Sequence, residues 1–137
     1  MKDEIFIVTI EKDKDGAFIA YNVDESPYTL IGRGATVKEA KADFENSMQE
    51  VKESEEERKG AAAPILGAAP VFRFDLSSLF EYYSMLNVSA FARYLGINET
   101  LMRQYKKGNT YISDAQLKKI EDGLHRLGAD FLGLRLV

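Results

Sequence analysis

The residues best suited to chemistry form a short polar run between two glycines, Gly96 and Gly108. The run contains Arg103, which can bond bidentately to guanine, and Gln104, which can bond in the same way to adenine in a major groove. Hydroxyl, amide and lysine side chains beside them suit sugar and phosphate contacts. The sequence therefore predicts a DNA-binding surface composed of Asn98, Thr100, Arg103, Gln104, Lys106 and Lys107.

Five scaffold positions around this run meet the steric requirements of two helices that cross at a tight turn. A small residue stands midway along the first helix, and a glycine four positions later tolerates a positive φ. An apolar residue follows the glycine, and two inward positions of the second helix are apolar. These five positions are Ala92, Gly96, Ile97, Met102 and Tyr105. Their spacing predicts a helix-turn-helix from about Asn87 to Lys107.

Capping residues and apolar spacing predict further helices around this pair. Asp75 caps a preceding helix, Asn87 or Ser89 caps the first helix of the pair, and Asn98 caps the second. Ser113 caps a final helix with apolar residues at Leu117, Ile120, Leu124 and Leu127. Strict alternation from Leu132 to Leu136 predicts a short terminal strand, which has no partner within one chain and therefore suggests a dimer contact.

The spacing from about Asp75 to Leu127 resembles the repressor-type helix-turn-helix of the lambda Cro and Xre kind. The resemblance implies a lambda-repressor-like all-α domain. It also implies that Asn98, Thr100, Arg103 and Gln104 read an operator, and that a homodimer or higher homo-oligomer binds paired half-sites. The alternative is a helical hairpin that only mediates protein interaction or oligomerisation. Glu99 favours this alternative, because a carboxylate repels phosphate unless it accepts from a cytosine amino group.

The first half of the chain predicts strands and one long helix in the order β-β-β-α-β. The expected strands are Glu4–Lys12, Ala17–Val23, Thr29–Arg33 and Ala69–Phe74. The helix begins after Thr36, which forms a capping box with Glu39, and its apolar stripe predicts that it covers one sheet face. We therefore expect an α+β chain with two domains, residues 1–74 and residues 75–137.

Three pieces of this first domain resemble the HicB antitoxin family of HicA–HicB toxin–antitoxin systems. They are the opening strands FIVTIEK and AFIAYNV and the helix entry Gly34–Ala40. The resemblance implies a β-β-β-α-β fold with a partial RNase H-like sheet. It further implies that the first domain binds a HicA-type RNA-cleaving toxin, while the second represses the operon as a transcription regulator.

No constellation of catalytic or metal-binding residues is visible in the sequence. There is no cysteine, the predicted strands are apolar inside, and Glu11, Asp13 and Asp15 cluster at a turn. The single histidine, His125, lies beside an apolar helical stripe. We therefore expect no enzymatic activity, no catalytic residue, no metal and no cofactor.

Charge is distributed unevenly along the chain. Up to Leu76 there are 10 basic and 16 acidic residues, and from Ser77 onward there are 8 basic and 6 acidic residues. This asymmetry indicates two units with different partners. The start of the chain lacks the pattern of a signal peptide, and no apolar run approaches the roughly 18 residues of a membrane span. We expect a soluble cytoplasmic protein without a membrane partner.

Overall fold

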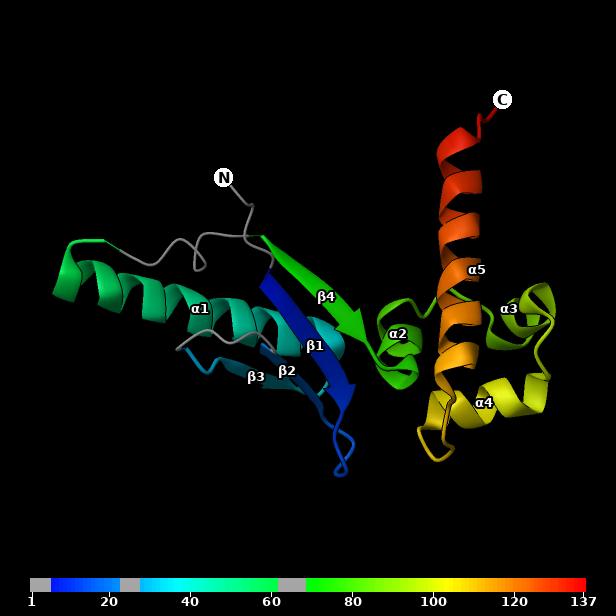
Figure 1. Ribbon diagram of the computed structural model, residues 1–137, viewed down its shortest axis with the longest axis horizontal. Coiled ribbons are helices and arrows are strands. Elements are labelled where there is room, and N and C mark those ends of the chain that lie inside the picture. Colours follow the sequence, from blue (N-terminus) through cyan, green and yellow to red (C-terminus); the bar gives the residue numbers. More distant parts are fainter. Residues whose placement is uncertain (1–5, 23–27, 62–68) are drawn as a thin grey trace. The chain divides into compact units, whose positions relative to one another are not determined.

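The structure is a computed structural model that describes residues 6–22, 28–61 and 69–137. In these residues the chain is a mixed α+β protein with one four-stranded sheet and five helices (Figure 1). It divides into two compact units, Met1–Ser84 and Met85–Val137.

The first unit is built around a sheet with the strand order β3-β2-β1-β4. Its strands are β1 (Phe6–Lys12), β2 (Phe18–Asn22), β3 (Ile31–Gly34) and β4 (Pro70–Phe74). The first three pair antiparallel, whereas β4 lies parallel to β1. Parallel pairing requires a crossover, and the helix α1 (Val37–Lys59) supplies it. The predicted order β-β-β-α-β is confirmed.

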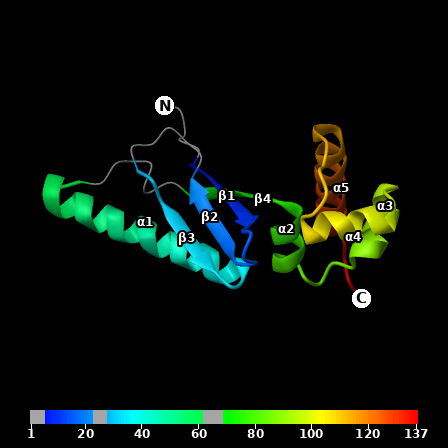
Figure 2. The ribbon, with the colours of Figure 1, turned by 90° about the horizontal axis from the view of Figure 1, so that it is seen from below.

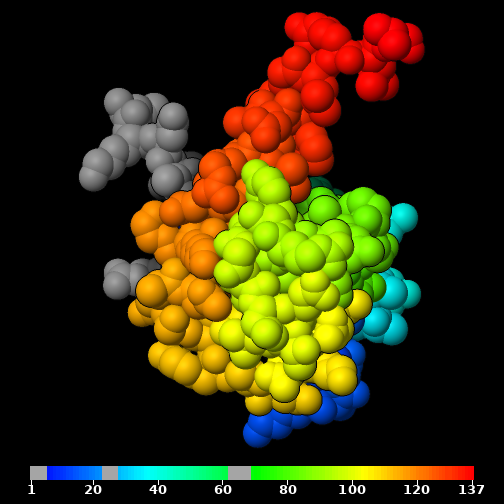
Figure 3. All heavy atoms as spheres, turned by 90° about the vertical axis from the view of Figure 1, so that its right-hand side faces the viewer, coloured from blue at the N-terminus to red at the C-terminus, as the bar shows by residue number. Residues whose placement is uncertain are grey.

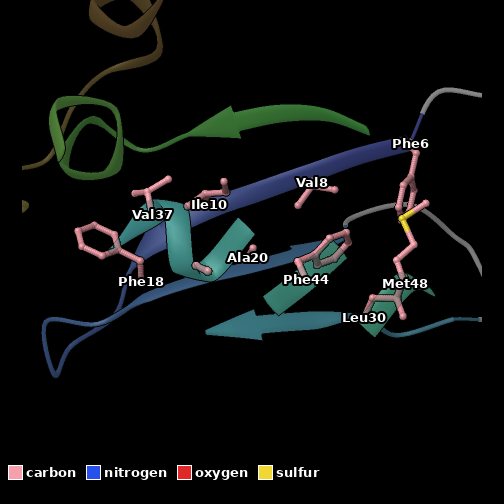
Figure 4. Close-up of a cluster of buried hydrophobic side chains, with 10 residues drawn as sticks. Phe6, Val8, Ile10, Phe18, Ala20, Leu30, Val37, Phe44 and Met48 are labelled. Carbon is pink, nitrogen blue, oxygen red and sulfur yellow. The ribbon is translucent and has the colours of Figure 1, made fainter. Parts of the chain in front are cut away.

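Helix α1 covers one face of this sheet (Figure 2). The Thr36 hydroxyl accepts from the Glu39 backbone N–H at 3.1 Å, which confirms the predicted cap. Large apolar side chains of the strands and of α1 interlock between the two layers (Figure 4), namely Phe6, Val8, Ile10, Phe18, Leu30, Val37, Phe44 and Met48. A Cβ on Gly32 would lie 2.5 Å from the Ala40 carbonyl oxygen, so glycine is required where α1 crosses β3.

A short helix, α2 (Leu76–Tyr82), also belongs to the first unit. Its Glu81 carboxylate accepts from the Val37 backbone N–H at 2.9 Å, and Asp75, which caps it, accepts from the Lys12 backbone N–H at 3.1 Å. These bonds connect α2 to the start of α1 and to β1. The division between the units therefore follows Ser84, whereas the sequence placed it after Phe74.

The second unit contains α3 (Val88–Leu95), α4 (Glu99–Lys107) and α5 (Asp114–Gly133). Its core consists of Phe91, Ala92, Leu95, Ile97, Met102, Tyr105 and Ile120. A Cβ on Gly123 would collide with the Leu95 side chain, so this glycine lets α5 lie directly against α3.

The terminal strand predicted from Leu132 to Leu136 is wrong. Helix α5 continues through Leu132 to Gly133, and no regular structure follows up to Val137. The alternating leucines fit the period of a strand and led to the wrong prediction. A strand needs a neighbour for its backbone groups, whereas a helix satisfies its own, so the helix is favoured here. Among the described residues, no helix is long and apolar enough to cross a membrane.

Candidate nucleic-acid interface

The hairpin formed by α3 and α4 is bounded by residues that fix where each helix starts and stops. The Asn87 side-chain oxygen accepts from the Ala90 backbone N–H at 2.8 Å, and the Asn98 oxygen accepts from Leu101 at 3.0 Å. Between them, Gly96 takes a left-handed conformation with φ of 73° and ends α3. These caps satisfy N–H groups that a helix start leaves open. Of the two caps considered for α3, the structure selects Asn87 over Ser89.

The scaffold positions deduced from spacing are packed as predicted. Ala92 and Met102 are fully buried, and Ile97 and Tyr105 are nearly so. The Ile97 backbone N–H donates to the Ala92 carbonyl at 2.9 Å across the turn. A small residue at 92 therefore allows the two helices to approach, and the inner face of the hairpin is fixed against the core.

The polar residues predicted to bind DNA are all exposed: Asn98, Thr100, Arg103, Gln104, Lys106 and Lys107. Residues three, four and seven positions apart share one helix face, so Thr100, Arg103, Gln104 and Lys107 lie together on the outer face of α4. Lys106 lies on the flank of this face. The oxygen of Asn98 is engaged as the helix cap, which gives that residue a structural role in addition to any contact with a ligand.

The guanidinium of Arg103 is held in place by neighbouring hydroxyls. It donates to Ser89 Oγ at 2.9 Å and to Thr100 Oγ1 at 3.1 Å. The side chain remains half exposed, so these bonds orient the guanidinium without removing it from solvent. Prior ordering of a long side chain lowers the entropy lost when it binds a partner.

The carboxylate of Glu99 lies between two arginines. Its Oε1 is 2.6 Å from an Arg93 guanidinium nitrogen, and its Oε2 is 3.9 Å from Arg103. This pairing neutralises the Glu99 carboxylate, which was the sequence feature that argued against DNA binding. From Val88 to Lys107 the hairpin carries four basic residues and one acidic residue, so a net positive charge remains.

Sequence reasoning missed two residues at this surface. Arg93 and Ser89 lie on α3 but contact side chains of α4, and such cross-helix pairs leave no periodic signal in the sequence.

The acidic residues at the β1–β2 turn are engaged in structural bonds. Glu11 accepts from the Tyr21 hydroxyl, Asp15 accepts from the Ala17 N–H, and Asp13 pairs with Arg33 at 3.0 Å. Hydrogen bonds from the Lys14 backbone N–H and from Arg33 lower the pKa of Asp13. Within the described ranges, no three histidine or acidic side chains are grouped so as to hold a metal ion. His125 is exposed, with Nε2 3.9 Å from Glu121.

Comparisons with protein-family models, curated proteins and solved structures give no match to this chain.

Proposed function

We propose that the chain is a sequence-specific DNA-binding transcription regulator, a repressor, that uses α3 and α4 as a helix-turn-helix. The observation that carries the proposal is the outer face of α4. It presents Thr100, Arg103, Gln104 and Lys107 together on a helix whose opposite side is buried. A short exposed helix with this donor and acceptor set fits a major groove.

In this proposal each polar residue has one of two roles. Arg103 and Gln104 bind base edges, assisted by Thr100 and Asn98 near the start of α4. Lys106 and Lys107 bind phosphates at its end, and these contacts set affinity rather than sequence preference. Arg93 becomes a third phosphate contact when Glu99 is released or turned toward a cytosine amino group.

The first unit supports an antitoxin-like role of the HicB type. Its order of three strands, a helix and a parallel fourth strand agrees with the order that the HicB resemblance implies. Among the described residues, the sheet face away from α1 also exposes apolar side chains, including Ile31 and Val71. We propose that this unit binds a protein partner such as a HicA-type toxin.

Substitution of the base-reading residues tests the DNA-binding proposal. Arg103→Ala and Gln104→Ala should each weaken binding to the DNA upstream of the chain's own gene by roughly tenfold or more, since a bidentate base contact contributes about 1–3 kcal/mol. Fluorescence anisotropy of a labelled duplex measures the affinity. Lys38→Ala and Gln49→Ala are matched controls, because both residues are exposed on α1 in the first unit.

Unchanged affinity in Arg103→Ala and Gln104→Ala, with the fold intact by circular dichroism, would contradict the proposed reading face. Absence of any salt-dependent DNA binding by the full chain would instead favour the second function considered, a protein-interaction or oligomerisation module. The exposed apolar end of α5 is the specific observation that favours this second function.

Co-expression with a neighbouring short reading frame tests the toxin proposal. A HicA-type product should be small, basic and contain a single histidine. We expect it to co-purify with the full chain and to lose RNA-cleaving activity in the complex. A neighbouring product of this kind that remains active and separate would contradict the partner role.

A further inference from the structure

The two edges of the sheet differ in how their backbone groups are bonded. At the β3 edge, Ser47 of α1 donates from its hydroxyl to the Ile31 carbonyl at 3.2 Å. Asp43 of α1 accepts from the Arg33 backbone N–H at 2.9 Å. These side chains close the β3 edge to a further strand. At the β4 edge, no described group bonds the strand from outside (Figure 1).

The pairing of β4 with β1 determines which backbone groups face this open edge. Just after β4, the Asp75 backbone N–H donates to the Ile10 carbonyl of β1 at 3.1 Å. Successive residues of a strand direct their backbone groups to opposite edges. The backbone groups of Arg73 therefore also face β1, whereas those of Phe72 and Phe74 face outward. Their N–H and C=O groups are spaced to pair with one more extended chain.

Aromatic rings line the α1 side of this edge. Phe72 and Phe74 point toward α1 and are half-buried there. The Phe74 ring packs against Tyr82 and Tyr83, with ring centroids 5.9 and 6.3 Å away. Tyr83 is 40% exposed. A side chain placed beside the outer edge of β4 on this side would therefore contact apolar ring surface.

Two basic side chains beside β4 have no acidic partner among the described residues, Lys41 and Arg73. Lys41 of α1 lies with its Nζ 4.3 Å from the centroid of the Phe72 ring, and it donates to the Tyr82 hydroxyl at 3.3 Å. Arg73 is exposed on the opposite face of the sheet. The first half of the chain is acidic overall, so the β4 edge is a local region of unpaired positive charge.

We propose that the β4 edge binds an extended, acidic segment of a partner protein, which adds to the sheet antiparallel to β4. Backbone bonds to Phe72 and Phe74 supply affinity, and alternate side chains supply specificity. Apolar side chains of the segment pack on the aromatic rings, and acidic side chains lie beside Arg73 on the other face. Pro70 also faces outward but has no N–H, so the pairing centres on Phe72 and Phe74.

This edge differs from the surfaces used in the proposed function. The toxin proposal uses the open face of the sheet around Ile31, and the DNA proposal uses the α3–α4 hairpin, which lies at the surface of the second unit (Figure 3). Strand addition at β4 depends on neither proposal, so each of the three can fail alone.

The first test measures amide hydrogen exchange by nuclear magnetic resonance in the full chain, with a short peptide of alternating valine and glutamate as the probe. In the free chain, the Phe72 and Phe74 amides should exchange fast, while the Arg73 amide is protected by β1. Saturating peptide should slow exchange at Phe72 and Phe74 by at least about tenfold and leave Arg73 unchanged.

Protection of the Phe72 and Phe74 amides in the free chain would overturn the proposal, because the edge would already be occupied. Failure of the peptide to bind would also overturn it, as would binding that leaves these two amides unprotected.

The second test separates backbone pairing from side-chain contact. In an antiparallel pair, the valines that share the α1 side with Phe72 also direct their N–H groups to β4. N-methylation of the valines should weaken binding by at least about tenfold, since hydrogen bonds to β4 are lost. N-methylation of the glutamates should leave the affinity unchanged. Equal affinities of the two methylated peptides, or loss only with methylated glutamates, would overturn antiparallel strand addition.

The third test uses two arginines on the same sheet face at opposite edges, Arg73 on β4 and Arg33 on β3. Arg73→Gln should weaken peptide binding by about two- to fivefold, which corresponds to the loss of an exposed ion pair. Arg33→Gln is the matched control and should leave the affinity unchanged. Fluorescence anisotropy of the labelled peptide measures both. An equal loss in the two variants, or a loss in Arg33→Gln alone, would overturn the assignment of the β4 edge.

Discussion

The side chains around Arg103 form a polar network that is ordered before any partner binds. Ser89 and Thr100 orient its guanidinium, and Glu99 pairs with Arg93 across the turn. Glu99 thus has two opposing effects. It orders the arginines, and it also places negative charge where a phosphate backbone would lie.

Replacement of Glu99 tests which of these effects dominates. Glu99→Gln keeps the side-chain size and removes the charge, so Arg93 becomes available for phosphate. We expect affinity for nonspecific duplex DNA to rise by roughly threefold, consistent with the modest strength of an exposed ion pair. Titration by fluorescence anisotropy measures this rise. Glu45→Gln, an exposed position on α1, changes the net charge equally and should have no such effect. A loss of affinity in Glu99→Gln would show that ordering dominates.

At the scale of elements, residue types define the α3–α4 hairpin almost completely. Its main features depend on residue type and spacing alone and can be read from the sequence. They are the caps at Asn87 and Asn98, the left-handed Gly96 and the buried Ala92 and Met102. The pairing of Arg93 with Glu99 follows from the crossing of two helices, and no periodicity encodes it. The end of α5 was mispredicted because Leu132 and Leu134 fit the strand period, and because the helix continues through Gly128 to Gly133 although glycine is unfavourable inside a helix.

A pair of glycine substitutions with opposite expected signs tests the turn. Gly96→Ala should lower the free energy of unfolding by about 1 kcal/mol, because φ of 73° strains any residue with a Cβ. Gly128→Ala should raise it by up to about 1 kcal/mol, because this glycine lies inside a helix with open space around it. Urea unfolding followed by circular dichroism measures both. Equal and small changes in the two variants would contradict the assigned role of Gly96.

At the scale of the whole molecule, the two units differ in charge and architecture. The acidic first unit has a sheet, and the mildly basic second unit has only helices among its described residues. The sequence predicted this division but placed α2 with the second unit. The apolar spacing of α2 indicates a helix. Which unit it joins depends on hydrogen bonds from the backbone N–H groups of Val37 and Lys12, and these residues are distant from α2 in the sequence.

The charge distribution predicts how DNA binding depends on salt. Three basic residues of each α3–α4 hairpin are proposed to contact phosphate: Arg93, Lys106 and Lys107. Each such contact contributes a slope of about −0.9 to a plot of log binding constant against log salt concentration. We expect a slope of about −3 for each bound chain, and Lys107→Ala should reduce its magnitude by about 0.9. A slope near zero would exclude phosphate contact by these residues.

The most direct test of the central claim is to locate the DNA-contacting residues by nuclear magnetic resonance. Amide chemical shifts of the ¹⁵N-labelled full chain would be followed as duplex DNA from upstream of its own gene is added. We predict that the largest changes fall on residues 98–107 of α4 and its turn, with further changes at Ser89 and Arg93. Changes confined to the first unit, or none at all, would contradict the assignment of α4 as the DNA-reading helix.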